Sequence, residues 1–81
     1  MYNVYVLIDE NKKLYKGMTN NLERRLMDHK RGHATTTRRM KNVELAYKEE
    51  FDNFKDARRR ELYFKTAAGR RFLKKKIKRD P

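Results

Sequence analysis

Hydrophobic and polar positions alternate in three short segments, and this pattern predicts three β-strands. Residues 2–8, YNVYVLI, are rich in the aromatic and β-branched side chains that strands favour. Residues 14–17, LYKG, predict a shorter strand that returns antiparallel after a polar turn. Such a hairpin would bring Tyr5 and Tyr15 into nearby rungs of the sheet. Residues 43–51, VELAYKEEF, alternate well enough to predict the third strand.

A helix is predicted within residues 19–33, TNNLERRLMDHKRGH, which lie between the second and third strands. Asn20 can cap its start, because Glu23 follows three residues later as the partner in a capping box. Gly32 suits the left-handed position just beyond the end of a helix. The segment that follows, ATTTRRMK, is polar and basic and predicts a loop.

Two more helices are predicted in the second half of the chain. Residues 52–65 carry Asn53 as a cap, and residues 67–80 form a short, strongly basic segment with Gly69 near its start. The order is strand, strand, helix, strand, helix, helix. We therefore expect an α/β (α+β) fold with a three-stranded, mostly antiparallel sheet flanked by three helices, in a single domain of residues 1–81.

The first predicted helix turns an arginine toward its apolar side. Leu22 and Leu26 lie on one stripe of this helix, and Arg25 lies within about 60° of Leu22. Arg24 is expected to point to the opposite side, where it would be an ordinary solvated arginine.

The second long helix poses the same problem with the opposite charge. Phe54, Ala57 and Phe64 define its inward stripe, and Glu61 lies within that stripe. Glu61 and Arg25 could form a structural ion pair at the edge of the core, or they could belong to a functional site. Helical periodicity alone leaves both explanations open.

Charge is the strongest signal in the composition. The 81 residues include 23 Lys and Arg against 11 Asp and Glu, a net charge of +12 that favours a polyanionic partner such as nucleic acid. A basic soluble protein, or one that binds acidic partners, is the alternative. The chain has no cysteine, no apolar run of about 20 residues and no N-terminal signal sequence, so we expect a cytoplasmic protein without a membrane span.

The motifs, read in order, resemble the GIY-YIG nuclease superfamily, in particular its small single-domain bacterial members. The two half-motifs are NVY at residues 3–5 and YKG at residues 15–17, with Asn3 and Lys16 where the family name has glycine and isoleucine. TNNLERRLMDH is similar to the motif helix, and EEFDNFKDARRRELYFKT to the glutamate helix. The matching residues are Tyr5, Tyr15, Gly17, Arg25, His29 and Glu61.

The resemblance implies hydrolysis of DNA phosphodiester bonds with a single divalent metal ion. Glu61 would be the only protein ligand of Mg²⁺ or Mn²⁺, with waters completing the shell, and the ion would polarise the phosphoryl oxygen. Arg25 would grip the non-bridging phosphate oxygens through its planar guanidinium.

The same resemblance assigns roles to the other motif residues. Tyr15 is the candidate general base, and Tyr5 its hydrogen-bond partner or an alternate base. His29 would relay a proton or contact phosphate, and Gly17 would let the backbone approach the site without a Cβ. Alternatively, the tyrosines are simply strand aromatics and His29 a polar residue at the shoulder of the helix.

Basic side chains outside this set are candidates for contacting the DNA backbone, unless they are merely solvated. They are Lys16, Arg38, Arg39, Arg70, Arg71 and Lys74. We expect a metal-dependent endonuclease acting on branched, flapped or damaged DNA, either recruited by a protein partner or recognising DNA by shape. A non-catalytic nucleic-acid-binding module of the same fold, or an adaptor for acidic proteins, is the alternative.

Overall fold

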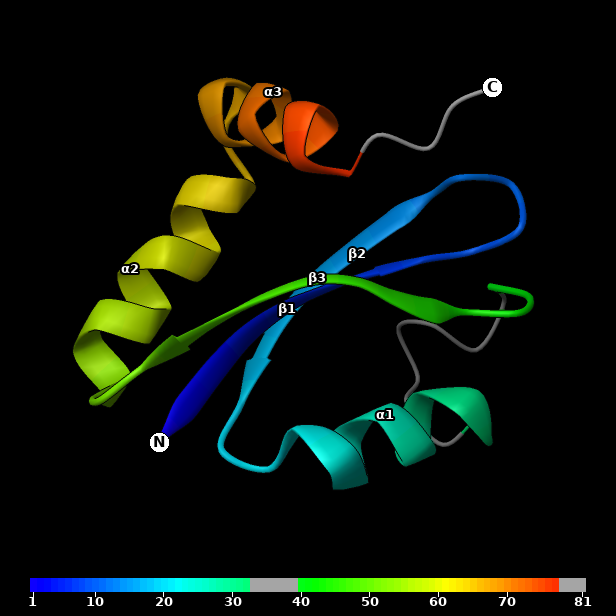
Figure 1. The fold of residues 1–81 in the computed structure, drawn as a ribbon, viewed down its shortest axis with the longest axis horizontal. Coiled ribbons are helices and arrows are strands. Elements are labelled where there is room, and N and C mark those ends of the chain that lie inside the picture. Colours follow the sequence, from blue (N-terminus) through cyan, green and yellow to red (C-terminus); the bar gives the residue numbers. More distant parts are fainter. Residues whose placement is uncertain (33–39, 78–81) are drawn as a thin grey trace.

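A computed structural model describes residues 1–32 and 40–77 of the chain. Within these ranges the elements are β1 (Tyr2–Ile8), β2 (Leu14–Thr19), α1 (Leu22–Lys30), β3 (Glu44–Phe51), α2 (Phe54–Phe64) and α3 (Ala67–Lys76) (Figure 1). The strands form one antiparallel sheet in the order β2-β1-β3. This confirms the predicted fold class and the predicted order of strands and helices.

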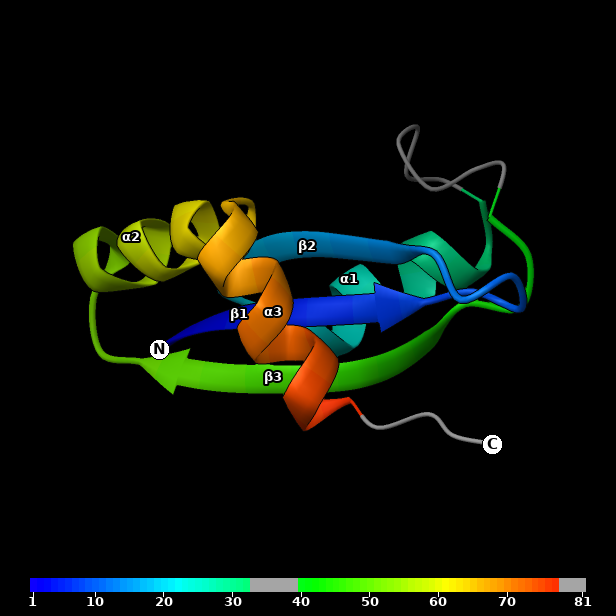
Figure 2. The ribbon, with the colours of Figure 1, turned by 90° about the horizontal axis from the view of Figure 1, so that it is seen from above.

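Helices cover both faces of the sheet, so the central strand β1 is buried on both sides. Helix α1 lies against one face, and α2 and α3 lie against the other (Figure 1, Figure 2). On the α2 and α3 side, Val4 and Val6 pack with three helical residues into the main core, namely Ala57, Phe64 and Leu73. Tyr5, which alternates with these valines, points toward α1 and is 1% exposed.

The start of α1 differs by one residue from the prediction. β2 extends to Thr19, two residues beyond the predicted strand, and the Thr19 hydroxyl accepts a hydrogen bond from the backbone N–H of Asn21 at 3.1 Å. Asn21, not Asn20, caps the helix, because its side chain accepts from the backbone N–H of Arg24 at 3.2 Å. The predicted capping box with Glu23 is therefore wrong. At the other end, Gly32 has the expected positive φ of 77°.

Helix α2 begins after the predicted cap, with the Asn53 side chain accepting from the backbone N–H of Asp56 at 2.8 Å. The inward stripe is confirmed for Ala57 and Phe64, whereas Phe54 is 54% exposed and packs edge-on against the Tyr2 ring. The first turn of α2 lies beyond the ends of the strands (Figure 2), so Phe54 meets Tyr2 at the start of β1 and its predicted place in the core is wrong.

A close approach between backbones fixes the junction of α2 and α3. The Thr66 side chain caps α3 by accepting from the backbone N–H of Gly69 at 3.1 Å. A Cβ at Gly69 would overlap the backbone carbonyl of Tyr63, so only glycine fits where the two helices meet. In the described part of the chain, no helix is long and apolar enough to cross a membrane.

Candidate active site

Three rings from three elements meet on the α1 face of the sheet. Tyr5 on β1 is paired with Gly17, and Tyr15 on β2 lies one same-face step away, with the two ring centroids 6.2 Å apart. The His29 ring of α1 closes the group at 5.8 Å from Tyr5 and 5.1 Å from Tyr15. The Tyr5 hydroxyl and His29 Nε2 are hydrogen-bonded at 2.9 Å. The predicted proximity of Tyr5 and Tyr15 is thus confirmed.

Gly17 makes the room that this ring cluster needs. A Cβ at this position would lie 2.7 Å from the Tyr5 Oη, a distance that real Cβ atoms do not adopt, and 3.0 Å from Cε2 of Tyr15, which is tighter than most real contacts. Because its rung partner Tyr5 is buried and tied to His29, the phenol has no free space to retreat into. The absence of a side chain at position 17 therefore lets both tyrosines share one face.

Burial and the Arg25 guanidinium set the protonation of the cluster. Burial raises the pKa of Tyr5 to about 12, although interaction with Arg25 opposes this rise. Burial, and next the positive charge of Arg25, lowers the pKa of His29 below its ordinary value. At neutral pH Tyr5 is therefore a protonated phenol and His29 a neutral imidazole. Tyr15 is only half-buried and is the phenol that solvent can reach.

Arg25 stands between the ring cluster and solvent. Interaction with the Tyr5 hydroxyl raises the pKa of Arg25 further, so the guanidinium remains charged. Its Nη1 lies 3.8 Å from Oδ2 of Asp28, one turn along α1, and its side chain is 40% exposed. Within the described residues, no ion pair joins Arg25 to Glu61. The closed structural ion pair that helical periodicity left open is not formed.

Glu61 approaches from the other side of the sheet. Its helix α2 packs against β1 and the edge strand β2, and the Glu61 side chain is 11% exposed. One carboxylate oxygen accepts from Arg58 at 2.9 Å and the other from Lys65 at 3.4 Å, both on the same helix. Periodicity left open an ion pair between Glu61 and the other helix. The structure instead pairs Glu61 with two cations of its own helix, at spacings of three and four residues.

A divalent metal ion can be accommodated at Glu61 only together with other oxygen donors. Among residues 1–32 and 40–77, no group of three or more His, Cys, Asp or Glu side chains lies together. Mg²⁺ is commonly held by one or two carboxylates, with waters and substrate phosphates completing its shell. The donor set therefore fits a hard ion with one protein ligand, provided that Arg58 or Lys65 releases a carboxylate oxygen. Both cations are about half exposed and can move into solvent.

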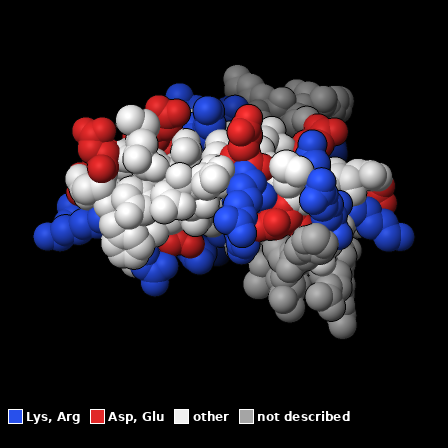
Figure 3. Space-filling view, turned by 90° about the horizontal axis from the view of Figure 1, so that it is seen from below, with Lys and Arg blue, Asp and Glu red and all other residues white. Residues whose placement is uncertain are grey.

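Three basic residues, Lys16 of β2, Lys65 at the end of α2 and Arg70 of α3, lie near one another on the face opposite to α1. Lys16 has its pKa lowered by partial burial first, and then by the nearby charges of Arg70 and Lys65. Arg70, Arg71 and Lys74 are exposed on α3. Arg38 and Arg39, predicted to contact DNA, lie outside the described residues. Figure 3 shows the other face of the molecule, the one that α1 covers. There, basic groups are interrupted by acidic and uncharged ones.

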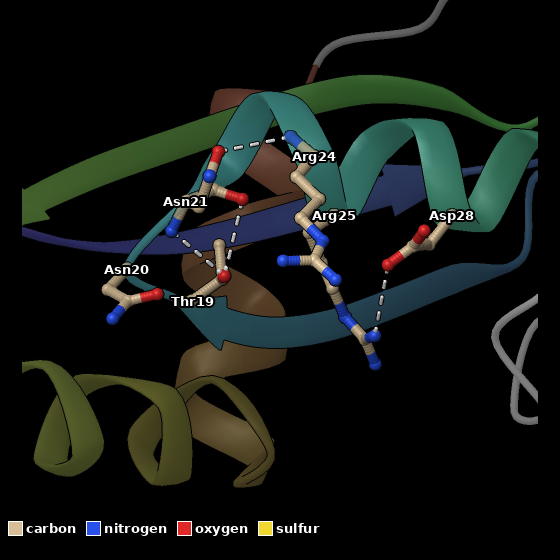
Figure 4. Close-up of a pocket in the computed structure, with 6 residues that line it drawn as sticks. All are labelled: Thr19, Asn20, Asn21, Arg24, Arg25 and Asp28. Carbon is tan, nitrogen blue, oxygen red and sulfur yellow. Dashed lines mark hydrogen bonds and ion pairs between the residues drawn. The ribbon is translucent and has the colours of Figure 1, made fainter.

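Sequence periodicity missed two residues beside Arg25. Asp28 forms the ion pair with Arg25, and its i,i+3 spacing could have identified it. Arg24 is exposed as predicted, but it does not point away from the site. It lines a surface hollow together with Arg25, because long arginine side chains can bend around the first turn of the helix (Figure 4).

Comparison with known proteins gives consistent results. The family model described as the GIY-YIG catalytic domain matches residues 1–77. A UPF0213 protein of Clostridium perfringens is 44% identical over 63 residues, which are 76% of this chain and 68% of that protein. A UPF0213 protein of Bacillus pumilus is also 44% identical over 63 residues, covering 76% and 64% of the two chains.

A solved structure supports the same relationship at the level of the fold. The solution NMR structure of a UPF0213 protein from Bacillus halodurans superposes with a TM-score of 0.56 at 27% sequence identity. The match covers 90% of this chain and 82% of that one.

Proposed function

The chain belongs to the GIY-YIG catalytic domain family, a superfamily of nucleases, and from this premise we propose that it is a divalent-metal-dependent endonuclease that hydrolyses DNA. The observation that carries the proposal is the meeting of Tyr5, Tyr15 and His29 over Gly17, with the partly exposed guanidinium of Arg25 beside them. A charged group next to a polar ring cluster on the face of a sheet is an arrangement that can receive a phosphate.

In this proposal Arg25 binds the non-bridging oxygens of the scissile phosphate. Its pair with Asp28 is long, at 3.8 Å, and its side chain is 40% exposed, so a phosphate can replace the carboxylate without a large structural change. The planar guanidinium offers two parallel donors to such a ligand.

Tyr15 is the proposed general base: as a phenolate, its oxygen would accept a proton from the attacking water. Tyr5 keeps its own proton, because burial raises its pKa to about 12. Since His29 is 3% exposed and hydrogen-bonded to Tyr5, we assign it a positioning role in place of direct phosphate contact. His29 would orient Tyr5, and Tyr5 would in turn hold the ring of Tyr15.

Glu61 is the proposed ligand of Mg²⁺ or Mn²⁺. When bound, such an ion supplies Lewis-acid stabilisation of charge on the phosphate and on the leaving oxygen. The protein's contribution is a carboxylate, 11% exposed, whose two oxygens are held in place by Arg58 and Lys65. These two cations could then turn toward the substrate.

The DNA is proposed to run along the basic residues around the edge strand β2. Lys16, Arg70, Arg71 and Lys74 would contact phosphates, which gives affinity without reading the base sequence. Recognition of branched or damaged DNA by its shape, recruitment by a protein partner and a cytoplasmic location belong to the same proposal.

The test is cleavage of single-stranded, duplex and branched DNA in Mg²⁺, Mn²⁺ or EDTA. We expect cleavage only with metal, and a loss of roughly 10²-fold or more in kcat for Arg25→Ala and Glu61→Gln. Arg59→Gln, which removes a charge from an exposed position of α2, is the control and should cleave like the wild type. Cleavage that persists in EDTA, or in both variants, would refute the mechanism.

A second outcome favours another function. If the protein binds all three DNA substrates but cleaves none of them under any metal condition, it is a non-catalytic nucleic-acid-binding module of the same fold. The feature that favours this alternative is the incomplete first half-motif, which has Asn3 in place of glycine.

A further inference from the structure

A surface hollow of ≈ 310 Å³ opens between the end of β2 and the first turns of α1 (Figure 4). Its lining residues are Thr19, Asn20, Asn21, Arg24, Arg25 and Asp28. One water molecule occupies about 30 Å³ in the liquid, so the hollow is large enough for a phosphate with its adjoining sugar.

The lining of this hollow suits the backbone of a nucleic acid better than a base. All six lining side chains are polar or charged, and none is aromatic or aliphatic. Proteins bind unpaired bases by stacking them on aromatic rings, which this surface does not offer. Two guanidinium groups face one carboxylate, and that carboxylate, Asp28, already pairs with Arg25. The ligand that remains favoured is an anion.

Arg24 is the lining residue that the proposed mechanism does not use. Its backbone N–H is taken by the cap, since it donates to Asn21, but its side chain forms no ion pair with any residue that the structure describes. The Arg24 and Arg25 side chains extend into the same hollow from adjacent positions of α1 (Figure 4). Arg25 reaches inward to Tyr5, whereas Arg24 is exposed at the outer side.

We infer that Arg24 binds a second DNA phosphate, the one adjacent to the phosphate held by Arg25. This inference rests on the proposed function, because it takes the Arg25 side of the hollow as the place of the reacting phosphate. Two neighbouring guanidiniums would then fix the direction of one DNA strand across the β2–α1 junction. The two guanidinium groups would thereby determine which phosphodiester bond of the strand is placed for cleavage, without reading the base sequence.

The experiment measures DNA binding in EDTA, so that it does not depend on catalysis. Arg24→Gln and Arg24→Lys are compared with the wild type by fluorescence anisotropy, using a labelled duplex and its single strand over a range of salt concentrations. Arg59→Gln is the matched control, because it removes the same charge from an exposed helical position outside the hollow. Circular dichroism of each variant verifies that the fold is retained.

We expect Arg24→Gln to weaken binding roughly 3–10-fold and to reduce the salt dependence by about one counterion, independently of sequence. Arg24→Lys should recover part of the loss, since it keeps the charge but lacks the planar fork. An Arg24→Gln affinity and salt slope equal to those of Arg59→Gln would overturn the inference.

The two proposals fail in different ways. A protein that cleaves DNA normally while Arg24→Gln behaves like the control retains the proposed function and loses the second phosphate contact. A protein that never cleaves, but whose DNA affinity depends on Arg24 beyond the control, retains the phosphate contact and is a binding module.

Discussion

Replacement of Gly17 by alanine tests the geometry of the site without assuming an activity. The added Cβ would lie 2.7 Å from Oη and 2.8 Å from Cζ of Tyr5, whereas ordinary contact begins at 3.4 Å. The phenol must therefore retreat by about 0.7 Å, which is difficult for a side chain that is 1% exposed. The hydrogen bond from Tyr5 to His29, now 2.9 Å, would be stretched or broken.

The expected magnitude follows from these contacts. Overpacking costs about 1–3 kcal/mol, and a weakened buried hydrogen bond costs about 1 kcal/mol more. Alanine is favoured over glycine within a strand by about 0.5–1 kcal/mol, which offsets part of this loss. Gly17→Ala should thus lower the free energy of unfolding by about 1–3 kcal/mol. In a domain of this size each kcal/mol lowers Tm by about 4–8 °C.

Urea and thermal unfolding of a double-mutant cycle measure the effect. Tyr5→Phe removes the Oη that the new Cβ would meet first, so Gly17→Ala should cost less in the Tyr5→Phe background. We expect a coupling of at least about 0.5 kcal/mol between the two positions. If Gly17→Ala is neutral or stabilising, or if the two losses are additive, the close packing of Tyr5 over Gly17 is not what stabilises this site.

Other predictions concern Gly69, the buried phenol of Tyr5 and the partly buried Arg60. Gly69→Ala should destabilise the chain by more than 2 kcal/mol, about 8 °C or more in Tm, although alanine is the better helix former; an unchanged Tm would refute the backbone overlap with Tyr63. Folding raises the pKa of Tyr5 from 10.0 to about 12, so the protonated phenol contributes about 3 kcal/mol to the free energy of unfolding. This contribution is intact below pH 10 and is lost as the pH rises through 12. Urea unfolding across this range should show the extra loss in the wild type and not in Tyr5→Phe, and an identical pH dependence of both would contradict the burial of the phenol. Arg60→Ala should cost about 2 kcal/mol in urea unfolding, since the Arg60 guanidinium bonds Glu49 at 2.9 Å and lies 4.8 Å from the Phe72 ring centroid, whereas Arg59→Ala should change stability by less than about 0.5 kcal/mol.

Periodicity also did not reveal a partly buried ion pair, in which Arg60 of α2 bonds Glu49 of β3 at 2.9 Å. Arg60 lies off the inward stripe of α2, yet its side chain is only 30% exposed and lies over three aromatic rings, those of Tyr63, Phe64 and Phe72. Helical position gives the direction of the Cα–Cβ bond but not the path of a long side chain. Whether an arginine on the flank of a helix bends inward depends on what the neighbouring elements offer.

Local sequence determined the order of the elements, because strand alternation, helical periodicity and the Asn53 cap act over a few residues. It also identified the ordered set of motif residues by resemblance, and the proximity of Tyr5 and Tyr15 followed from the pairing of a hairpin. These features depend on chain neighbours, which the sequence states directly.

Only the tertiary structure decided how the charged residues are used. The sequence placed Arg25 and Glu61 on the inner sides of two helices, but it could not tell that the helices cover opposite faces of the sheet. No ion pair joins these two residues in the described part of the chain: Glu61 takes its partners from its own helix, and Arg25 faces Tyr5. Periodicity gives each helix an inward direction, whereas the choice of face comes from packing between segments distant along the chain.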